Sequence, residues 1–132
     1  MQDQFNVSTS TRIEFVNITS RVQECVSKIG IKDGLVIVFV PHTTAGITIN
    51  EQADPDVERD IIMKLNDIVP DRGDYRHAEG NSPAHIKASL MGSSVTVIVT
   101  GGKLELGTWQ GIFFCDFDGP RTRRVWIKTI AG

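Results

Sequence analysis

The fold of this chain is decided by a short apolar run, Leu35-Val36-Ile37-Val38-Phe39-Val40. An uninterrupted run of this kind, rich in β-branched residues, predicts a central strand of a sheet that is covered on both faces. The turn signal Lys32-Asp33-Gly34 precedes the run, and Pro41 ends it. The other elements are therefore expected to pack around this strand.

Further strands are predicted on both sides of this run. Their expected ranges are Phe5 to Ile18, Thr43 to Asn50, Ser94 to Thr100, Trp109 to Asp116, and Arg124 to Ile130. The segment from Gly101 to Gly107 predicts a loop or flap. The connections between the last three strands are too short for helical crossovers, so we expect these strands to pair antiparallel.

Two to three short helices are predicted between the strands. Their expected starts and ends are Thr19 or Ser20 to Ile29, Asp54 to Ile68, and Asn81 or Ser82 to Met91. Gly30 and Gly92 follow the first and third helices as natural stops, and Asp54-Pro55 is a strong start signal for the second. The element order is β-α-β-β-α-loop-α-β-β-β, which favours an α+β domain with an antiparallel sheet or sandwich.

Length and composition indicate a single domain covering residues 1–132. Apolar residues make up 40% of the chain, charged residues 23%, and the formal net charge is −2. These values are typical of a globular protein and give no general attraction to nucleic acid or to an anionic membrane. The basic stretch from Arg121 to Arg124 does not by itself establish phosphate binding.

The sequence favours a cytoplasmic location. It contains no apolar run of about eighteen residues, and its first residues lack the pattern of a secretory signal. Its two cysteines, Cys25 and Cys115, lie in apolar settings and are expected to be buried thiols.

The three histidines all lie in predicted loops or at the starts of elements. His42 follows the central strand, while His77 and His85 bracket the start of the third helix. Three imidazoles with an open fourth position would suit Zn²⁺ or a similar metal. The spacing matches no strong zinc motif, and the alternative is that the histidines cap turns or bond to the backbone.

Two further polar clusters are candidates for ligand binding. Glu51 and Asp54 straddle a strand-to-helix corner, where carboxylates could hold Mg²⁺ beside a substrate phosphate, although Asp54 is equally explained as a helix cap. In the glycine-rich segment, Lys103 could attract an anion and Trp109 could stack on a flat heterocycle. The alternative for this segment is an ordinary hairpin with the tryptophan in the core.

Several segments together resemble one protein family. Residues 94–112 read SVTVIVTGGKLELGTWQGI, residues 41–51 read PHTTAGITINE, and residues 77–85 read HAEGNSPAH. These segments, with Asp54 to Asp60, are similar to the blocks of the YjbQ family, which is also called the secondary thiamine-phosphate synthase family. The likeness extends from about Phe5 to Ile130.

The resemblance implies a fold, an assembly and an activity. The fold is a compact α+β domain with an antiparallel sheet, the assembly is a homotrimer, and the site lies near the subunit interfaces. The implied activity is a weak, secondary thiamine-phosphate synthase reaction. It joins a pyrimidine diphosphate to a thiazole phosphate and releases pyrophosphate.

The resemblance also assigns the site to particular residues. The expected catalytic residues are His42, His77, His85, Glu51 and Glu79, and the three histidines are also the expected metal ligands. Asn50, Asp54, Asn81, Ser82, Trp109 and Gln110, together with Lys103, are expected to bind substrate. We therefore expect a transferase that acts on a small phosphorylated heterocycle with a divalent metal, Zn²⁺ or Mg²⁺. The alternative is a protein that binds a metal or small anion without a dedicated catalytic role.

Overall fold

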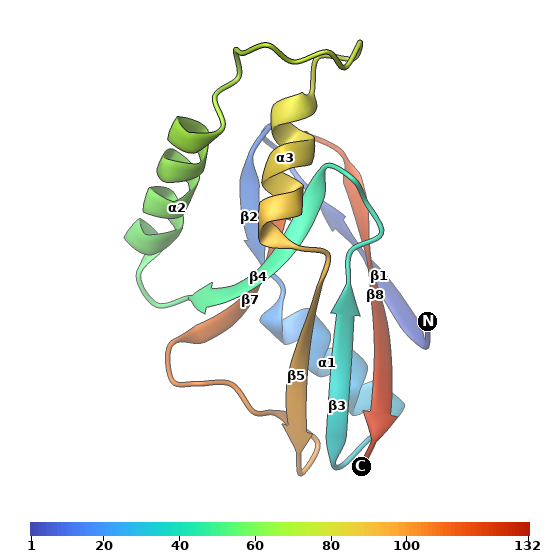
Figure 1. Cartoon of the computed structure of the whole chain (residues 1–132). Helices are drawn as coiled ribbons and strands as arrows, with labels where there is room; N and C mark the ends of the chain where they lie inside the picture. The colour runs from blue at the N-terminus through green and yellow to red at the C-terminus, as the bar shows by residue number, and fades with distance from the viewer.

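The computed structural model describes residues 1–132 and consists of two antiparallel sheets and three helices (Figure 1). The strands are β1 (Asp3–Ser8), β2 (Glu14–Asn17), β3 (Gly34–Phe39), β4 (Ala45–Glu51), β5 (Ser94–Thr100), β6 (Lys103–Leu104), β7 (Gln110–Asp116) and β8 (Thr122–Ala131). The helices are α1 (Thr19–Ile29), α2 (Pro55–Ile68) and α3 (Ser82–Met91). The predicted α+β class is confirmed.

The predicted strand from Phe5 to Ile18 is wrong, because this segment forms two strands in different sheets. β1 pairs with β8 in a five-stranded sheet of order β1-β8-β3-β5-β6, whereas β2 pairs with β7 in a three-stranded sheet of order β2-β7-β4. Between them, a carboxylate oxygen of Glu14 accepts hydrogen bonds from the backbone N–H groups of Ser10 and Thr11. These bonds fold the chain back on itself and end the first strand.

The expected pairing of the last three long strands with one another is also wrong. β5 pairs with β3, β7 pairs with β2 and β4, and β8 pairs with β1 and β3. All these pairs are antiparallel, but the short connections carry the chain from one sheet to the other. The predicted loop from Gly101 to Gly107 contains β6, whose two residues pair with the end of β5.

The helix boundaries agree closely with the sequence. Asp54 caps α2, as predicted, by accepting a hydrogen bond from the N–H of Asp56 at 2.9 Å. The prediction for α1 is displaced by one to two residues, since its cap position is Ile18 and the side chain of Asn17 accepts the N–H of Thr19 instead. Gly30 ends this helix in the left-handed conformation, at a φ of 86°, which favours glycine.

The three-stranded sheet lies between two apolar cores. The larger core has sixteen buried residues from α1, from the inner face of the five-stranded sheet, and from β4 and β7. The smaller core has six, from β2, β7 and α3 and the segment after β7, and side chains of α2 pack against it. β4 and β7 are thus held from both sides, which makes the start of β4 a rigid support for side chains.

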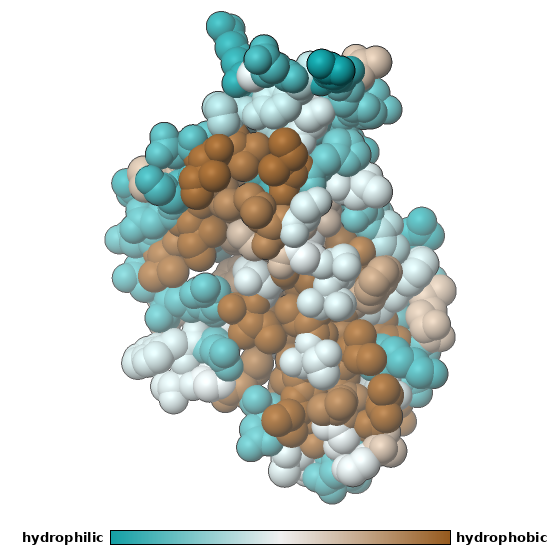
Figure 2. All heavy atoms as spheres, in the orientation of Figure 1, coloured by the Kyte–Doolittle hydropathy of each residue, from teal (hydrophilic) through white to brown (hydrophobic).

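The outer face of the five-stranded sheet is apolar and uncovered in the single chain. Val36 and Val38 are fully buried, but Leu35 on the other face is 38% exposed, so the predicted cover on both faces is wrong. Ile98 and Ile130 lie beside Leu35 on the neighbouring strands and are exposed as well. Figure 2 shows apolar side chains over β3, β5 and β8, and a second apolar region over α2 and α3. None of the helices is long and apolar enough to cross a membrane.

Candidate functional site

The three histidines lie at one end of the molecule, between α3 and the start of β8. His42 lies in the connection from β3 to β4, His77 in the loop before α3, and His85 in the first turn of α3. All three line one cavity of about 440 Å³, together with Glu79 and Asn81. No hydrophobic residue lines this cavity, which we call the oxyanion cavity.

His77 and His85 are neighbours in this cavity. Their ring centroids are 5.2 Å apart, and the rings meet edge to face at 86°. Glu79 lies beside this pair, with its carboxylate 4.0 Å from Nε2 of His77, beyond hydrogen-bond distance. The loop and the first turn of α3 therefore bring together two imidazoles and one carboxylate from a short stretch of sequence.

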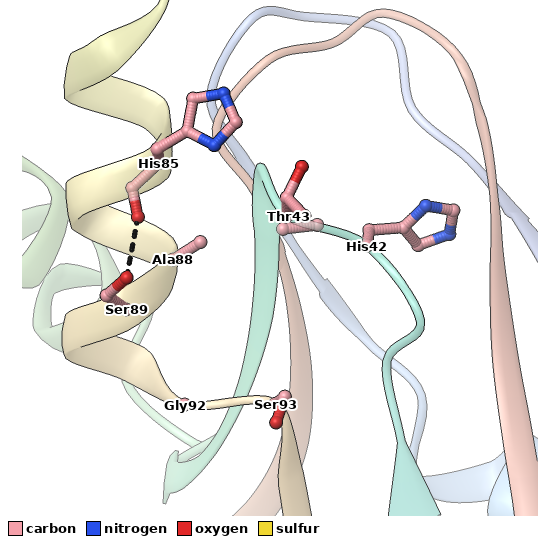
Figure 3. Close-up of a pocket in the computed structure, with 8 residues that line it drawn as sticks. His42, Thr43, His85, Ala88, Ser89, Gly92 and Ser93 are labelled. Carbon is pink, nitrogen blue, oxygen red and sulfur yellow. Dashed lines mark hydrogen bonds between the residues drawn. The ribbon is translucent and has the colours of Figure 1, made fainter.

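His42 has a different environment, because its ring is turned away from His85 towards β8 (Figure 3). Its Nε2 accepts a hydrogen bond from the backbone N–H of Arg124 at 2.8 Å. Burial, and then the positive charges of Arg123 and Arg124, lower the pKa of His42. Near neutral pH the ring is therefore neutral, and because Nε2 is an acceptor, the proton lies on Nδ1. His42 is a hydrogen-bond donor through Nδ1.

The three imidazoles do not fit the predicted three-histidine metal site. No group of three or more histidine, cysteine, aspartate or glutamate side chains is arranged to hold a metal ion. One nitrogen of His42 is already bonded to the backbone of β8.

A buried arginine completes one wall of the oxyanion cavity. Arg123 is only 3% exposed, and its guanidinium forms an ion pair with Asp116 at 2.7 Å and donates to the hydroxyl of Thr44 at 2.8 Å. The Nε–H of the same guanidinium is buried and has no partner. An unpartnered buried donor is costly, so Arg123 has hydrogen-bonding capacity that the chain itself does not use.

Asp116 holds Arg123 in place. Burial raises the pKa of Asp116, but hydrogen bonds from Arg123, from the N–H of Asp118 and from the hydroxyl of Thr9 together outweigh burial and lower it. The carboxylate is therefore ionised at neutral pH and balances the charge of Arg123. A group fixed in this way is already oriented before a ligand arrives.

The lining of the cavity also includes an acceptor that the chain does not use. One carboxylate oxygen of Asp118 accepts hydrogen bonds from the Asn81 amide at 2.9 Å and from Arg121 at 3.2 Å. The hydrogen bond from Asn81 to Asp118 uses the NH₂ group of the Asn81 amide. The amide oxygen, Oδ1, is buried and has no hydrogen-bond partner. Arg123 and Asn81 both line the cavity and each retain hydrogen-bonding capacity that the chain does not use.

Most of the remaining predicted residues lie elsewhere. Asn50 and Glu51 end β4, whose seven residues extend over roughly 20 Å from its start near the oxyanion cavity. Asp54 caps α2 just beyond them, and Lys103 lies in β6. Ser82 begins α3 beside Asn81 but does not line the cavity.

The tryptophan and glutamine of the glycine-rich segment also lie away from the histidines. Trp109 is 62% exposed, and Gln110 is paired with Glu51 at the far end of β4. The side-chain oxygen of Gln110 accepts the N–H of Gly107, which closes a local turn. The predicted site residues are therefore divided between the two ends of β4.

Sequence analysis missed the arginines, the hydroxyl groups and one carboxylate of the site. These residues are Thr43, Thr44, Asp118, Arg121 and Arg123. The signal was the basic stretch from Arg121 to Arg124. Arg121 lies just before β8 and Arg123 is the second residue of that strand, and both line the cavity with the histidines.

Comparison with known proteins identifies the family. A family model described as UPF0047 protein YjbQ-like matches residues 3–132. The chain belongs to the YjbQ-like UPF0047 family. The resemblance found in the sequence is thereby confirmed.

Members of this family from distant organisms have closely similar sequences and folds. A UPF0047 protein of Methanocaldococcus jannaschii is 52% identical over 96% of this chain and 91% of its own length. UPF0047 protein YugU of Bacillus subtilis is 50% identical over 92% of this chain and 93% of its own. A YjbQ/UPF0047 crystal structure from Clostridium acetobutylicum, described as an uncharacterised conserved protein, is 57% identical, covers 97% of this chain and 99% of its own, and superposes with a TM-score of 0.95. These descriptions give the family but no reaction.

Proposed function

We propose that the oxyanion cavity binds the phosphate or carboxylate group of a small molecule and that its histidines exchange protons with that molecule. The observation that carries the proposal is that Arg121 and Arg123 both line a cavity without hydrophobic residues, and that Asp116 and Thr44 fix the Arg123 guanidinium there. Arginine presents several N–H donors in a rigid plane that matches oxyanions. The neutral His42 adds a donor, and Arg121 adds a second guanidinium.

The pair of His77 and His85 supports an enzymatic role. Imidazole both accepts and donates protons and is the side chain most often used for general acid–base catalysis. His42 is less suited to act as a base, since its acceptor nitrogen is engaged by the backbone of β8. In this proposal His42 binds and orients the oxyanion, while His77 and His85 move protons.

The thiamine-phosphate synthase reaction implied by the resemblance stays a prediction. Both substrates of that reaction carry phosphate groups, so the oxyanion cavity is compatible with either of them. Direct assay of the coupling reaction tests it. The divalent metal also stays a prediction. Because no group of side chains is arranged to hold it, the form to test is an ion that arrives bound to a diphosphate substrate.

The predicted homotrimer stays a prediction as well. The exposed apolar face around Leu35, Ile98 and Ile130 supports association with further copies. Sedimentation analysis of the purified chain tests the trimer.

Titration with inorganic phosphate and pyrophosphate, followed by calorimetry in the presence of a chelator, tests the proposed function. Arg121→Gln is expected to weaken binding roughly tenfold or more, because a hydrogen bond to a charged group contributes about 1.5–3 kcal/mol. Arg121 is suited to the test since its side chain is 51% exposed and its loss leaves the core intact.

Lys28→Gln is the matched control. It removes one positive charge from an exposed ion pair on α1, far along the chain from the cavity, and should leave phosphate binding unchanged. If the unaltered protein binds neither anion, or if the two variants weaken binding equally, the oxyanion site is refuted.

A further inference from the structure

The outer face of the five-stranded sheet carries a second patch beside the apolar residues around Leu35. Every second residue of β8 lies on this face, so the side chains of Arg124, Trp126 and Lys128 point outwards together. The neighbouring strand β3 adds Phe39, which is paired with Trp126 in the sheet register. We call these four residues, two cations and two aromatic rings, the aromatic–basic patch.

The charge on this face is of one sign only. The chain as a whole has a net charge of −2, but Asp3 is the one acidic residue in the five strands, and it is paired with the buried Ile127 and lies on the inner face. Arg124 and Lys128 are exposed and take part in no ion pair of the chain. Figure 2 views this face and shows hydrophilic side chains beside the apolar ones, on the side of β8 and β1. An anionic partner is therefore the electrostatic complement of the patch.

The two aromatic rings form a row with room for a further ring. The ring centroids of Phe39 and Trp126 are 5.8 Å apart, and the rings are inclined by only 21°. Phe39 is 38% exposed, and its neighbour in the register on the other side is Ser94 of β5, which is exposed and has a small side chain. A flat ring therefore has space to stack on Phe39 above Ser94.

The spacing of the cations and rings favours a chain of bases and phosphates. Arg124 and Lys128 each lie two residues from Trp126 along β8, about 7 Å away in opposite directions. Proteins bind single-stranded nucleic acid with the same two elements, because aromatic rings stack on the bases and cations neutralise the phosphates. A duplex keeps its bases stacked on one another, and an acidic peptide has no series of flat rings.

We propose that the aromatic–basic patch binds single-stranded nucleic acid, with one base stacked on Phe39 above Ser94 and neighbouring phosphates at Arg124 and Lys128. This site is distinct from the oxyanion cavity, because Arg123 of the same strand is buried and points to the other side of the sheet. The proposal does not depend on the reaction of the histidines.

Self-association of the chain is compatible with this site. The apolar residues around Leu35 and Ile130 lie at the other end of the same strands, since Ile130 follows Trp126 by four residues, or about 13 Å. Contacts between copies at that end leave the patch accessible.

Fluorescence anisotropy of a labelled oligothymidine of about twelve nucleotides tests the proposal. The unaltered protein should bind it at low salt at least about fivefold more tightly than a duplex of the same length. Trp126→Leu should weaken binding of the oligothymidine roughly fivefold or more, because stacking on the row is lost.

The salt dependence separates the two cations from the rings. Each phosphate that a protein neutralises on a single strand adds about 0.7 to the slope of log affinity against log salt. The double variant Arg124→Gln, Lys128→Gln should therefore lower this slope by roughly 1.4. Trp126→Leu should leave the slope unchanged.

Two control variants make matched changes elsewhere. Trp109→Leu removes the other tryptophan, which is also exposed, and the double variant Lys28→Gln, Lys64→Gln removes two exposed cations from α1 and α2. Both should bind the oligothymidine as the unaltered protein does. Ser94→Leu, which fills the open position in the row from an exposed site, should weaken binding as well and decides the matter if Trp126→Leu does not fold.

Three results would overturn the proposal. The first is no binding of the oligothymidine at low salt. The second is an equal loss of affinity in the patch variants and the control variants. The third is binding of the duplex, or of vesicles of phosphatidylserine, at least as tightly as the single strand.

Discussion

The two ends of β4 are both polar in sequence but differ in how their polar groups are bonded. At the start, Thr44 accepts a hydrogen bond from Arg123, 79 positions away, and Thr9 bonds to Asp116 across 107 positions. At the far end, the bonds made by Asn50, Glu51 and Asp54 reach only one or two residues along the chain. Local bonds shape turns and caps, whereas distant bonds fix side chains around a cavity. The comparison therefore favours the start of β4 for the proposed site.

Removal of the Asp116 carboxylate is expected to give the largest difference in stability between the two ends of β4. Asp116→Ala leaves the buried charge of Arg123 uncompensated, which should lower the free energy of unfolding by about 3–5 kcal/mol. Glu51→Ala at the other end should change it by no more than about 0.5 kcal/mol. Urea denaturation of both variants measures the contrast. Equal losses would show that the buried network contributes no more than exposed carboxylates do.

The pH dependence of stability should also differ between the two ends. The pKa of His42 is lowered by burial and by two arginines, so the unfolded chain takes up a proton near the ordinary value of 6.5 before the folded chain does. The stability that neutral His42 contributes is thus fully present above the ordinary pKa of histidine. It is lost as the pH falls from that value towards the lower pKa of His42 in the folded chain. His42→Gln should lose less stability between about pH 7.5 and about pH 5.5 than the unaltered protein does.

Denaturation midpoints at the two pH values give the measurement for His42. Glu51→Gln, at the far end of β4, should retain the full decline of the unaltered protein. A His42→Gln variant that declines as steeply as the unaltered protein would mean that other groups carry the acid sensitivity.

The smallest effect is expected at Trp109. Because this side chain is 62% exposed, Trp109→Ala should change stability by no more than about 0.5 kcal/mol and should leave phosphate binding unaltered. Calorimetric titration with phosphate provides the check. A tenfold or greater loss of affinity would show that both ends of β4 act on one ligand, and would contradict a site confined to the start of β4.

Local signals were sufficient to predict most elements of the fold. The Asp54 cap, the glycine stops and the apolar runs depend on neighbouring residues, so α2, α3, β3 and β5 are recognisable from the sequence alone. The pairing of strands is not local. Nothing near Phe5 or Phe15 indicates that the first pairs with β8 and the second with β7.

The candidate site was predictable only in part for the same reason. His42, His77 and His85 stand out because each follows or precedes a regular element, but Arg123 becomes a site residue only through Asp116 and Thr44. Conversely, Glu51 lies close to His42 in sequence, yet an extended strand separates them in space. Residues close in sequence can be far apart in space when a strand lies between them, and residues far apart in sequence can be in contact across a sheet.

The bond between His42 and the backbone of β8 makes one amide a reporter of the site. The N–H of Arg124 can donate to the ring only while Nε2 carries no proton. Protonation of the ring removes the acceptor and releases this amide to solvent. The magnetic resonance signal and hydrogen-exchange rate of a single residue, 124, therefore follow the ionisation of His42 without any substrate or activity assay.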